Sequence, residues 1–351
     1  MMSMTDFKLV SLNVRGLRSL NKRKAILTWL IKQKADIVFL QETYSSSEDE
    51  NFWNTQWKGK MLFSHVSNHS KGTLVLVKQG LDFEQKSVLC DPNGRFIILE
   101  AVVQDTPFLL ANIYAPNKIH EQEASFQKIE RNLDSYDFDP NSKIVIGGDF
   151  NIFFDEDLDC LDGQSKIKQK SVNVKDIMLA NELIDVWRIH HPDKKRFTWR
   201  KPNSTIQRRL DFWLISNSTQ EDIFSTDIIP AIKTDHSAIT LNFKKIVEHK
   251  PGPSYWKFNS SLVDDREYTD FTKNSYPNWL EEYKDITSKR LLWDIIKYRI
   301  RKETISFSKQ KAKEHRDKLL ELEKEVKRCQ EICDETPISE NLTGLEETRI
   351  T

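Results

Sequence analysis

The chain has 351 residues, of which 53 are basic and 53 are acidic, so its formal net charge at pH 7 is zero. This length can bury a full core, either in one domain of about 250 residues with an extension or in two domains. A zero net charge excludes attraction to a polyanion through total charge, so any such binding would depend on local clusters of Lys and Arg.

The cysteines and the N-terminus predict a soluble intracellular protein. The four cysteines are too few and too scattered for a disulfide framework, and none forms the CxxC pair typical of structural zinc. The first ten residues, MMSMTDFKLV, lack the apolar centre of a signal peptide, and no apolar run approaches the roughly 18 residues that a membrane span needs. We therefore expect a reducing compartment and no membrane partner, while the oligomeric state stays open.

Residues 7 to 243 alternate short β-rich runs with amphipathic stretches. The runs are FKLVSLN, DIVFLQ, GTLVLV, RFIILEAVV, FLLANIY, KIVIGGDFN, RLDFWLIS and AITLNF. Between them, residues 21–34 and 174–187 place apolar side chains on one helical face. Many strands with few helices predict an α/β fold in which two packed sheets are flanked by helices, and we assign this α/β sandwich to residues 1–245.

A helical extension is predicted to follow this domain. Two prolines around a glycine in HKPGPSYWKFN mark a boundary, so we place a linker at residues 246–260, a helical basic extension at 261–335 and a disordered tail at 336–351. Residues 289–318 hold eleven Lys or Arg against four Asp or Glu. A solvated helix with one packed stripe is one interpretation of this segment, and binding of nucleic acid or of a partner helix is the other.

Polar side chains end several of the predicted strands. In IVIGGDFN, residues 144–151, three β-branched residues lead through two glycines to Asp149 and Asn151. The same pattern recurs at Asn13, at Glu42, at Tyr114 with Asn117 just beyond, at Asp211, and at Asp235 with His236. Taken singly, these are ordinary turn or surface residues. Because strand ends can meet at one rim of a sheet protein, the set as a whole predicts a polar site.

The residue types in this set suit metal-assisted attack of water on a phosphodiester. That reaction must neutralise the phosphoryl oxygens, activate a water molecule and stabilise the leaving alkoxide. Glu42, with Asn13 as its neighbour and Asp235 as a further oxygen ligand, offers the hard donors that Mg²⁺ prefers. Asp149, kept near Asn151, would take the proton from the attacking water.

A histidine and a tyrosine complete the predicted site. The Asp211 carboxylate would hold the His236 ring in one tautomer, ready to bind or protonate a phosphate oxygen. Tyr114 adds a hydrogen-bond donor at the end of its strand.

Six short motifs in this order resemble the endonuclease/exonuclease/phosphatase superfamily. The motifs are LNV, QET, NIYAPN, GGDFN, RLDF and TDHS, and they cover about residues 7 to 245. The resemblance implies a four-layer α/β sandwich and Mg²⁺ as cofactor, with Mn²⁺ as a substitute. It also implies roles for site residues: Glu42 and Asn13 at the metal, Asp149 as base, Asn151 and Tyr114 as orienting groups, and Asp211 with His236 as a pair.

One further segment favours DNA as the substrate. Residues 197–216, FTWRKPNSTIQRRLDFWLIS, are similar to a segment of AP endonucleases and of the endonuclease domains of LINE-type non-LTR retrotransposons. The resemblance implies that Thr198 stands where those nucleases touch DNA. Residues 193–209 carry seven Lys or Arg against one Asp, with two aromatic residues interleaved. We therefore predict DNA contacts from Thr198, Arg196, Arg200, Arg208, Asn117 and Arg15. A solvated loop with two core aromatics is the alternative.

Two features distinguish the resemblance to LINE endonucleases from the resemblance to AP endonucleases. AP endonucleases usually have Asp two residues after the first Asn, where this chain has Arg15, and the LINE endonucleases tolerate variation there. GPSYWKFNSSLV and WDIIKYRIRKETISFSKQKAKE look like the connector that precedes reverse transcriptase in LINE-type polyproteins. No polymerase motif follows before Thr351, so we expect a fragment or a truncated copy of such a polyprotein.

The sequence therefore predicts a Mg²⁺-dependent DNA endonuclease that nicks one strand and leaves 3′-hydroxyl and 5′-phosphate ends, as in target-primed retrotransposition. An AP-site repair nuclease is the alternative of the same class, and a catalytically inactive nucleic-acid-binding module is the alternative of another class. Double-stranded DNA is the expected partner, with element RNA as a second ligand of the basic C-terminal helix. A genomic substrate implies the nucleus, with the cytoplasm as the other possibility.

An acidic run, FDEDLDCLDG at residues 154–163, has neither the ligand spacing nor the distal Glu of a calcium-binding loop. We expect it to form a solvated loop.

Overall fold

The structure is a computed structural model, and it describes residues 7–66, 69–134, 142–161, 172–202, 204–244, 258, 260–335 and 341. The chain divides into two compact units, one formed by residues 1–248 and 326–351 and the other by residues 249–325. The predicted tail at 336–351 lies outside the described residues except for Asn341, and only two residues of the predicted linker are described.

Two six-stranded mixed sheets form the body of the first unit. The first sheet has the order β14 (Ile223–Ile229), β15 (Ala238–Phe243), β1 (Phe7–Asn13), β2 (Ile37–Gln41), β4 (Thr73–Lys78) and β3 (Gly59–Ser64). The second has the order β10 (Leu183–Asp185), β13 (Asp211–Ser216), β8 (Lys143–Asp149), β7 (Thr106–Tyr114), β6 (Phe96–Val103) and β5 (Phe83–Cys90). All eight predicted runs are strands of these two sheets.

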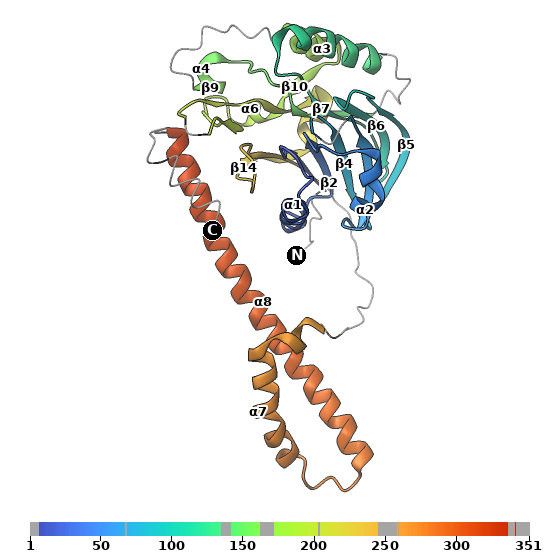
Figure 1. Cartoon of the computed structure of the whole chain (residues 1–351), viewed down its shortest axis with the longest axis vertical. Helices are drawn as coiled ribbons and strands as arrows, with labels where there is room; N and C mark the ends of the chain where they lie inside the picture. Colours follow the sequence, from blue (N-terminus) through green and yellow to red (C-terminus); the bar gives the residue numbers. More distant parts are fainter. Residues whose placement is uncertain are drawn as a thin grey trace. The chain divides into compact units, whose positions relative to one another are not determined.

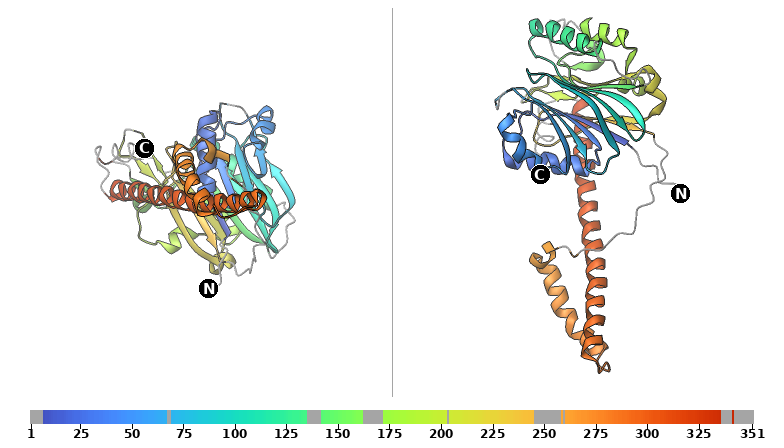
Figure 2. Two further views of the ribbon diagram at one scale, coloured as in Figure 1. Left: turned by 90° about the horizontal axis from the view of Figure 1, so that it is seen from below. Right: turned by 90° about the vertical axis from the view of Figure 1, so that its right-hand side faces the viewer.

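Helices cover the outer face of each sheet. Among the described residues up to 244, the helices and 3-10 turns are α1 (Leu20–Lys32), η1 (Ser47–Asp49), α2 (Glu50–Asn54), α3 (Ile119–Asp134), α4 (Glu156–Asp159), α5 (Val172–Ala180), α6 (Val186–His190) and η2 (Asn217–Asp222). Figure 1 shows α3 on one side of the sheets and α1 on the other, and the right-hand view of Figure 2 shows the sheets between these layers. The predicted four-layer α/β sandwich is therefore confirmed.

Three apolar clusters separate the layers. The cluster between the sheets joins Phe39 of β2 to Trp213 of β13, whose ring centroids lie 5.4 Å apart. A second cluster packs α3 and α5 on the second sheet, and a third packs α1 on the first sheet. These contacts explain why the central strands are continuous apolar runs, since both of their faces are buried.

The helix predicted over residues 174–187 is interrupted in the structure. α5 ends at Ala180, the edge strand β10 follows, and α6 begins at Val186. Glu182 has a φ of +49°, which no α-helix accommodates. The apolar positions of this segment are shared between a helix and a strand, which a single helical period cannot distinguish.

Buried amides fix the register between the two sheets near the site. Gln41 Nε2 of β2 donates to Asn112 Oδ1 of β7 at 2.7 Å, and Asn112 Nδ2 donates to the carbonyls of Leu40 and Leu74, each at 3.1 Å. Because a buried polar group needs its partners, sliding one sheet over the other would leave these amides unpaired. The strand ends at this rim therefore have fixed positions.

The two glycines of GGD are required by close packing. A Cβ on Gly147 would lie 2.2 Å from the Trp213 ring of the paired strand, and a Cβ on Gly148, whose φ is +140°, would lie 1.9 Å from the Ile113 carbonyl oxygen. No larger residue fits at either position without displacing buried atoms. The glycines thus let β8 carry Asp149 close to its neighbouring strands.

The acidic run after β8 is only partly solvated, which corrects our expectation. Asp159 is fully buried and accepts hydrogen bonds from Arg209 Nε at 2.7 Å and Nη2 at 3.1 Å, and Arg188 also pairs with it. Asp185 binds the same Arg209 guanidinium at 2.7 Å. Charge pairing therefore ties this segment to a three-stranded sheet formed by β11 (Trp199–Arg200), β12 (Gln207–Arg208) and β9 (Cys160–Leu161).

The second unit is helical. It contains η3 (Ser260–Asp264), α7 (Arg266–Glu282) and the larger part of α8 (Lys289–Glu335). An aromatic cluster joins α7 to α8: the Tyr268 and Phe307 ring centroids lie 5.3 Å apart, and the Tyr268 hydroxyl lies 2.6 Å from Thr304 Oγ1. Among the described residues, no helix is both long enough and apolar enough to cross a bilayer.

We predict that Gly147→Ala destabilises the first unit by about 1–3 kcal/mol, because the new methyl group overlaps the buried Trp213 ring. Gly80→Ala is the matched control, since Gly80 has a φ of +83° but no atom within 4 Å of the added Cβ. Its cost should be limited to roughly 1–2 kcal/mol of backbone strain. The free energies of unfolding in urea test this, and an unchanged stability of Gly147→Ala would contradict the packing argument.

Candidate active site

The predicted polar residues lie together at one rim of the sandwich. Asn13 ends β1, Glu42 follows β2, Asp149 ends β8 and Asp211 begins β13. In the second sheet, Asp149 is paired with Asp211 on one side and with Tyr114 on the other. The strand register thus gathers residues that are far apart in sequence.

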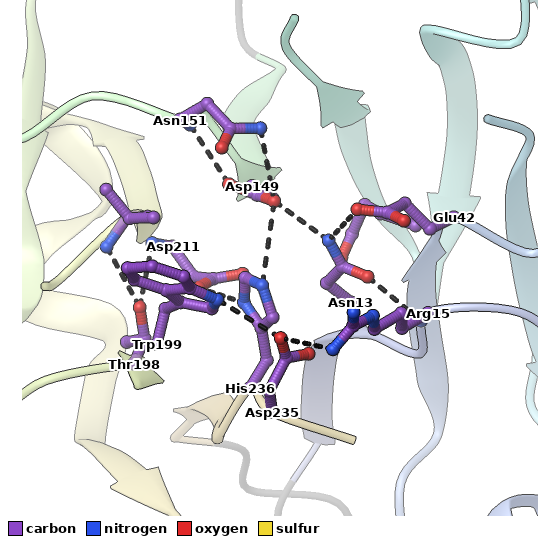
Figure 3. A network of polar contacts seen from close by, with 12 residues as sticks. Asn13, Arg15, Glu42, Asp149, Asn151, Thr198, Trp199, Asp211, Asp235 and His236 are labelled. Carbon is purple, nitrogen blue, oxygen red and sulfur yellow. Dashed lines mark hydrogen bonds and ion pairs between the residues drawn. The ribbon is translucent and has the colours of Figure 1, made fainter. Parts of the chain in front are cut away.

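Asp149 lies at the centre of the network (Figure 3). Its carboxylate accepts hydrogen bonds from Asn13 Nδ2 at 2.8 Å and from the Asn151 backbone N–H at 3.0 Å, and Asn151 Nδ2 lies 3.3 Å away. His236 Nε2 lies 4.0 Å from Asp149 Oδ2. Asn151 has a φ of +50°, which turns its amide back towards the carboxylate, and it also donates to the Ala115 carbonyl. Asp149 is 1% exposed.

Glu42 is linked to Asp149 through Asn13. The Asn13 amide donates to Glu42 Oε1 at 2.9 Å as well as to Asp149, so one side chain joins the two sheets (Figure 3). The Tyr44 hydroxyl donates to Glu42 Oε2 at 2.6 Å. Glu42 is half-buried and has a φ of +52°. Sequence reasoning missed Tyr44, although its place two residues after Glu42 in QETY was a usable signal.

His236 and Asp211 form a buried pair. His236 Nδ1 lies 3.0 Å from Asp211 Oδ2, so the Nδ1–H donates to this carboxylate and Nε2 is directed towards Asp149. Thr198 Oγ1 accepts the backbone N–H groups of Leu210 and Asp211, which fixes the start of β13. The predicted Asp–His pair is therefore present as a contact.

The electrostatics of the pair keep a proton within the site. Burial alone would lower the pKa of His236, but the charge and hydrogen bond of Asp211, followed by the charges of Asp149 and Asp235, raise it to about 10. Burial and the negative charge of Asp211 raise the pKa of Asp149 to about 7, against the opposing effects of His236 and the Asn13 hydrogen bond. At neutral pH the histidine is a cation, and Asp149 is poised to exchange a proton.

Tyr114 is buried beside the acidic groups. Burial and the charges of Glu42 and Asp149 raise the pKa of its hydroxyl, so the phenol stays protonated. The Arg95 guanidinium lies over its ring at 5.0 Å from the centroid. A protonated hydroxyl at this position can donate a hydrogen bond but cannot act as a base at neutral pH.

Asp235 is bound by a cationic side chain. Its Oδ2 accepts from Arg15 Nη1 at 2.9 Å and from Trp199 Nε1 at 3.2 Å (Figure 3). Its Oδ1 is buried and has no hydrogen-bond partner among the described residues. The Arg15 side chain is 57% exposed, so this guanidinium pairs with Asp235 and still faces solvent.

The structure corrects the placement of three predicted DNA contacts. Thr198, Arg196 and Arg200 are 0%, 2% and 6% exposed, because Thr198 caps β13 and both arginines pair with Asp334 of α8. Among the other predicted contacts, Asn117 is exposed, Arg208 is half-buried, and Arg15 lies at the rim. Asp334 lies 134 residues after Arg200, so it could not be inferred from a local basic run.

The residues that could hold a metal include one close cluster and two further carboxylates. Among the residues that the structure describes, Asp149, Asp211 and His236 form the cluster whose ligand atoms all lie within 4.8 Å of one another, whereas Glu42 and Asp235 do not join it. A metal at this cluster would need the His236 ring in its neutral form. Glu42 and the Asp235 Oδ1 atom, which has no hydrogen-bond partner among the described residues, offer the carboxylate oxygens that a hard divalent cation prefers.

This fold and this site define a class of hydrolase in which carboxylates, amides and a charged histidine gather at the strand ends of a two-sheet sandwich. The sequence profile of the Endonuclease/Exonuclease/phosphatase family matches residues 10–236. The chain belongs to this family, which confirms the resemblance that its motifs carry. The family match therefore assigns the chain to the enzymes that cleave phosphoesters.

Two curated relatives extend the comparison. The chain is 27% identical over 295 residues to the Transposon TX1 uncharacterized 149 kDa protein of Xenopus laevis, covering 83% of this chain and 22% of that protein. It is 26% identical over 258 residues to the Exodeoxyribonuclease of Bacillus subtilis (strain 168), covering 67% of this chain and 98% of that enzyme. The chain therefore spans about a fifth of the length of the transposon protein.

Solved structures share the fold. The AP endonuclease of Leishmania major matches with a TM-score of 0.58 at 16% identity, over 69% of this chain and 88% of that one. An AP endonuclease from Archaeoglobus fulgidus matches with a TM-score of 0.55 at 20% identity, over 68% of this chain and 99% of that one. At these identities the likeness concerns the fold.

The raised pKa values predict a pH-dependent stability in metal-free buffer. Stabilisation from the His236 proton is complete below the unfolded pKa of 6.5 and is lost as the pH rises through about 10. We expect the wild-type advantage in unfolding free energy over His236→Asn to fall by roughly 3–5 kcal/mol between pH 6.5 and 10. His190→Asn, at an exposed histidine, is the control. A wild-type advantage that stays constant over this range would contradict a charged His236.

Proposed function

We propose that this chain is a Mg²⁺-dependent DNA endonuclease that nicks one strand of a duplex and leaves 3′-hydroxyl and 5′-phosphate ends. The observation that carries the proposal is the buried Asp149 carboxylate, held by Asn13 and Asn151 and facing the charged His236. A base and a cation so close together suit attack of water on an anionic phosphodiester. The nuclease named among the curated relatives supports DNA as the substrate.

Glu42 would hold the cation, with Asn13 beside it and Asp235 as a further oxygen donor. When bound, Mg²⁺, or Mn²⁺ in its place, neutralises the charge of the phosphoryl oxygens and of the leaving alkoxide. Asn13 and the Tyr44 hydroxyl each donate to one oxygen of Glu42, so the carboxylate is oriented before a cation arrives.

Asp149 and His236 would divide the proton chemistry. Asp149, with a pKa raised to about 7, takes the proton from the attacking water, while Asn13 and Asn151 keep its carboxylate in place. His236 points Nε2 into the site and donates a hydrogen bond to a phosphate oxygen, because Asp211 holds Nδ1. The Tyr114 hydroxyl, which stays protonated, would orient the phosphate.

DNA contacts would come from the exposed residues around this rim. Arg15, Asn117 and Arg208 are the predicted contacts that the structure leaves fully or partly accessible. Arg15 pairs with Asp235 through one amino group, and its exposed guanidinium can present further donors to a phosphate as a fork. We therefore assign Arg15 the phosphate next to the scissile bond.

Asp149→Asn should lower the rate of nicking of supercoiled plasmid by about 10² to 10⁴, because the amide cannot accept the proton of water. Asp157→Asn, at an exposed carboxylate outside the site, should retain wild-type activity. EDTA should abolish nicking by the wild type and by this control. A fully active Asp149→Asn variant with unchanged unfolding would overturn the proposed mechanism. A wild type that binds plasmid without nicking it in Mg²⁺ would instead support a catalytically inactive binding module.

A competition between two duplexes separates this function from that of an AP-site repair nuclease. The resemblance to LINE endonucleases and the transposon relative favour intact target DNA, and Arg15 occupies the position where AP endonucleases usually have Asp. We expect an intact AT-rich duplex to be nicked at a rate within tenfold of the same duplex carrying one abasic site, measured on denaturing gels. A much stronger preference for the abasic strand would favour the repair nuclease.

The helical unit is the proposed place for a second ligand, element RNA. Trp293 and Tyr298 of α8 are 56% and 69% exposed, and exposed basic residues flank them, namely Arg290, Lys297, Arg301 and Lys302. Aromatic platforms among basic side chains suit unpaired bases and their phosphates. A genomic DNA substrate would further require this activity in the nucleus.

A further inference from the structure

The last turns of α8 belong to the same compact unit as the catalytic sandwich. We call Val326–Asp334 the C-terminal α8 segment. Three of its side chains are buried: Gln330 and Cys333 are 0% exposed and Asp334 is 8% exposed. A helix segment with buried polar side chains is bound to the domain through specific contacts.

Asp334 lies between two arginines that we expected to bind DNA. Its Oδ2 lies 2.9 Å from Arg196 Nε, and its Oδ1 pairs with Arg200 Nη2. All three side chains are less than a tenth exposed. Because buried guanidinium groups need a counterion, removing the Asp334 carboxylate would take from Arg200 its buried ion-pair partner and would leave Arg196 with the longer contact to Glu331, 3.5 Å from its Nη1.

The contacts continue from Asp334 to the loop that carries His236. Arg200 Nη1 donates to Ser237 Oγ at 3.3 Å, and Gln330 Nε2 of the same α8 segment donates to that oxygen at 3.1 Å. Ser237 is fully buried and follows His236 directly in the chain. Two separate hydrogen bonds thus hold the residue next to the histidine.

Backbone hydrogen bonds also hold the two residues that flank His236, Asp235 and Ser237. The Ser237 N–H donates to the Thr198 carbonyl at 2.6 Å, and the Arg200 N–H donates to the Asp235 carbonyl at 3.2 Å. Trp199 and His236 form an isolated bridge between these two segments. The segment from Asp235 to Ser237 is therefore clamped against residues 198–200, whose arginine is held by Asp334.

We propose that Asp334 is a positioning residue that fixes His236 in the catalytic site through Arg200 and Ser237. The proposal rests on the nuclease function proposed above. The family match ends at residue 236, so the proposal gives a part in the reaction to a helix outside the matched region. If the Asp334 carboxylate only blocked DNA-binding arginines, its removal would free these arginines to bind phosphate and would strengthen DNA binding.

The test uses the full chain with Asp334→Asn, which keeps the shape and removes the charge, and with Ser237→Ala. We expect Asp334→Asn to lower kcat for plasmid nicking by about ten- to a hundredfold while KM stays within twofold, as displacement of a catalytic group does. Ser237→Ala should have a similar effect, and the double variant should be no worse than the poorer single variant. Lys327→Gln is the control. Lys327 lies on the same α8 segment and forms a surface ion pair with Asp227 of β14, so its replacement should leave activity at the wild-type level.

Amide hydrogen exchange gives a second measurement that does not depend on activity. Asp334→Asn should accelerate exchange at the Arg200 and Ser237 amides, and Lys327→Gln should not. An unchanged kcat, a lowered KM, additive losses in the double variant, or exchange accelerated evenly over the whole sandwich would each overturn the proposal. If Asp334→Asn does not fold, Ser237→Ala tests the last step of this path, from Arg200 to the residue beside His236. If the wild type does not nick DNA, the proposed function fails, and the exchange data alone decide the positioning role.

Discussion

The buried carboxylate of Asp149 is the point on which the rest of this site depends. It ends a strand of the second sheet, yet it receives a hydrogen bond from Asn13 of the first sheet and faces His236 from the loop before β15. An ionised carboxylate in a buried place requires such donors and a nearby cation. The two sheets must therefore pack in one register for the site to exist, and the Gln41–Asn112 hydrogen bond between the sheets holds that register.

Close backbone packing makes this arrangement possible. Gly147 and Gly148 allow β8 to pass beneath Trp213 and against the Ile113 carbonyl, so that Asp149 reaches the rim between Asp211 and Tyr114. Burial and the proximity of Asp211 raise the pKa of Asp149, and the nearby acids raise the pKa of His236 against the effect of its burial. The structure thus places proton-binding groups together at a cost in electrostatic repulsion, which is typical of catalytic sites.

The basic segment between α6 and β13 has a different role from the one its composition indicates. Arg209 is buried with Asp159 and Asp185, and Arg196 and Arg200 are buried with Asp334. These arginines connect elements of the sandwich, including the end of α8, whereas Arg15 is an exposed cation beside the site. Positive charge in a sequence therefore indicates a nucleic-acid surface only where no buried acid neutralises it.

The sequence by itself determined the central strands, the four-layer architecture and the residues that gather at the rim, because continuous apolar runs and polar strand ends are local signals. It missed the edge strands β3, β5, β10 and β14 of the two large sheets, where short, alternating or half-exposed segments produce no continuous run. It also missed the two-residue strands β9, β11 and β12. Only the tertiary structure decided that Asn13 joins Glu42 to Asp149, that Tyr44 supports Glu42, and that Asp334 pairs with Arg196 and Arg200. These are contacts between distant segments, and their geometry depends on how the sheets and α8 pack, which no spacing along the chain records.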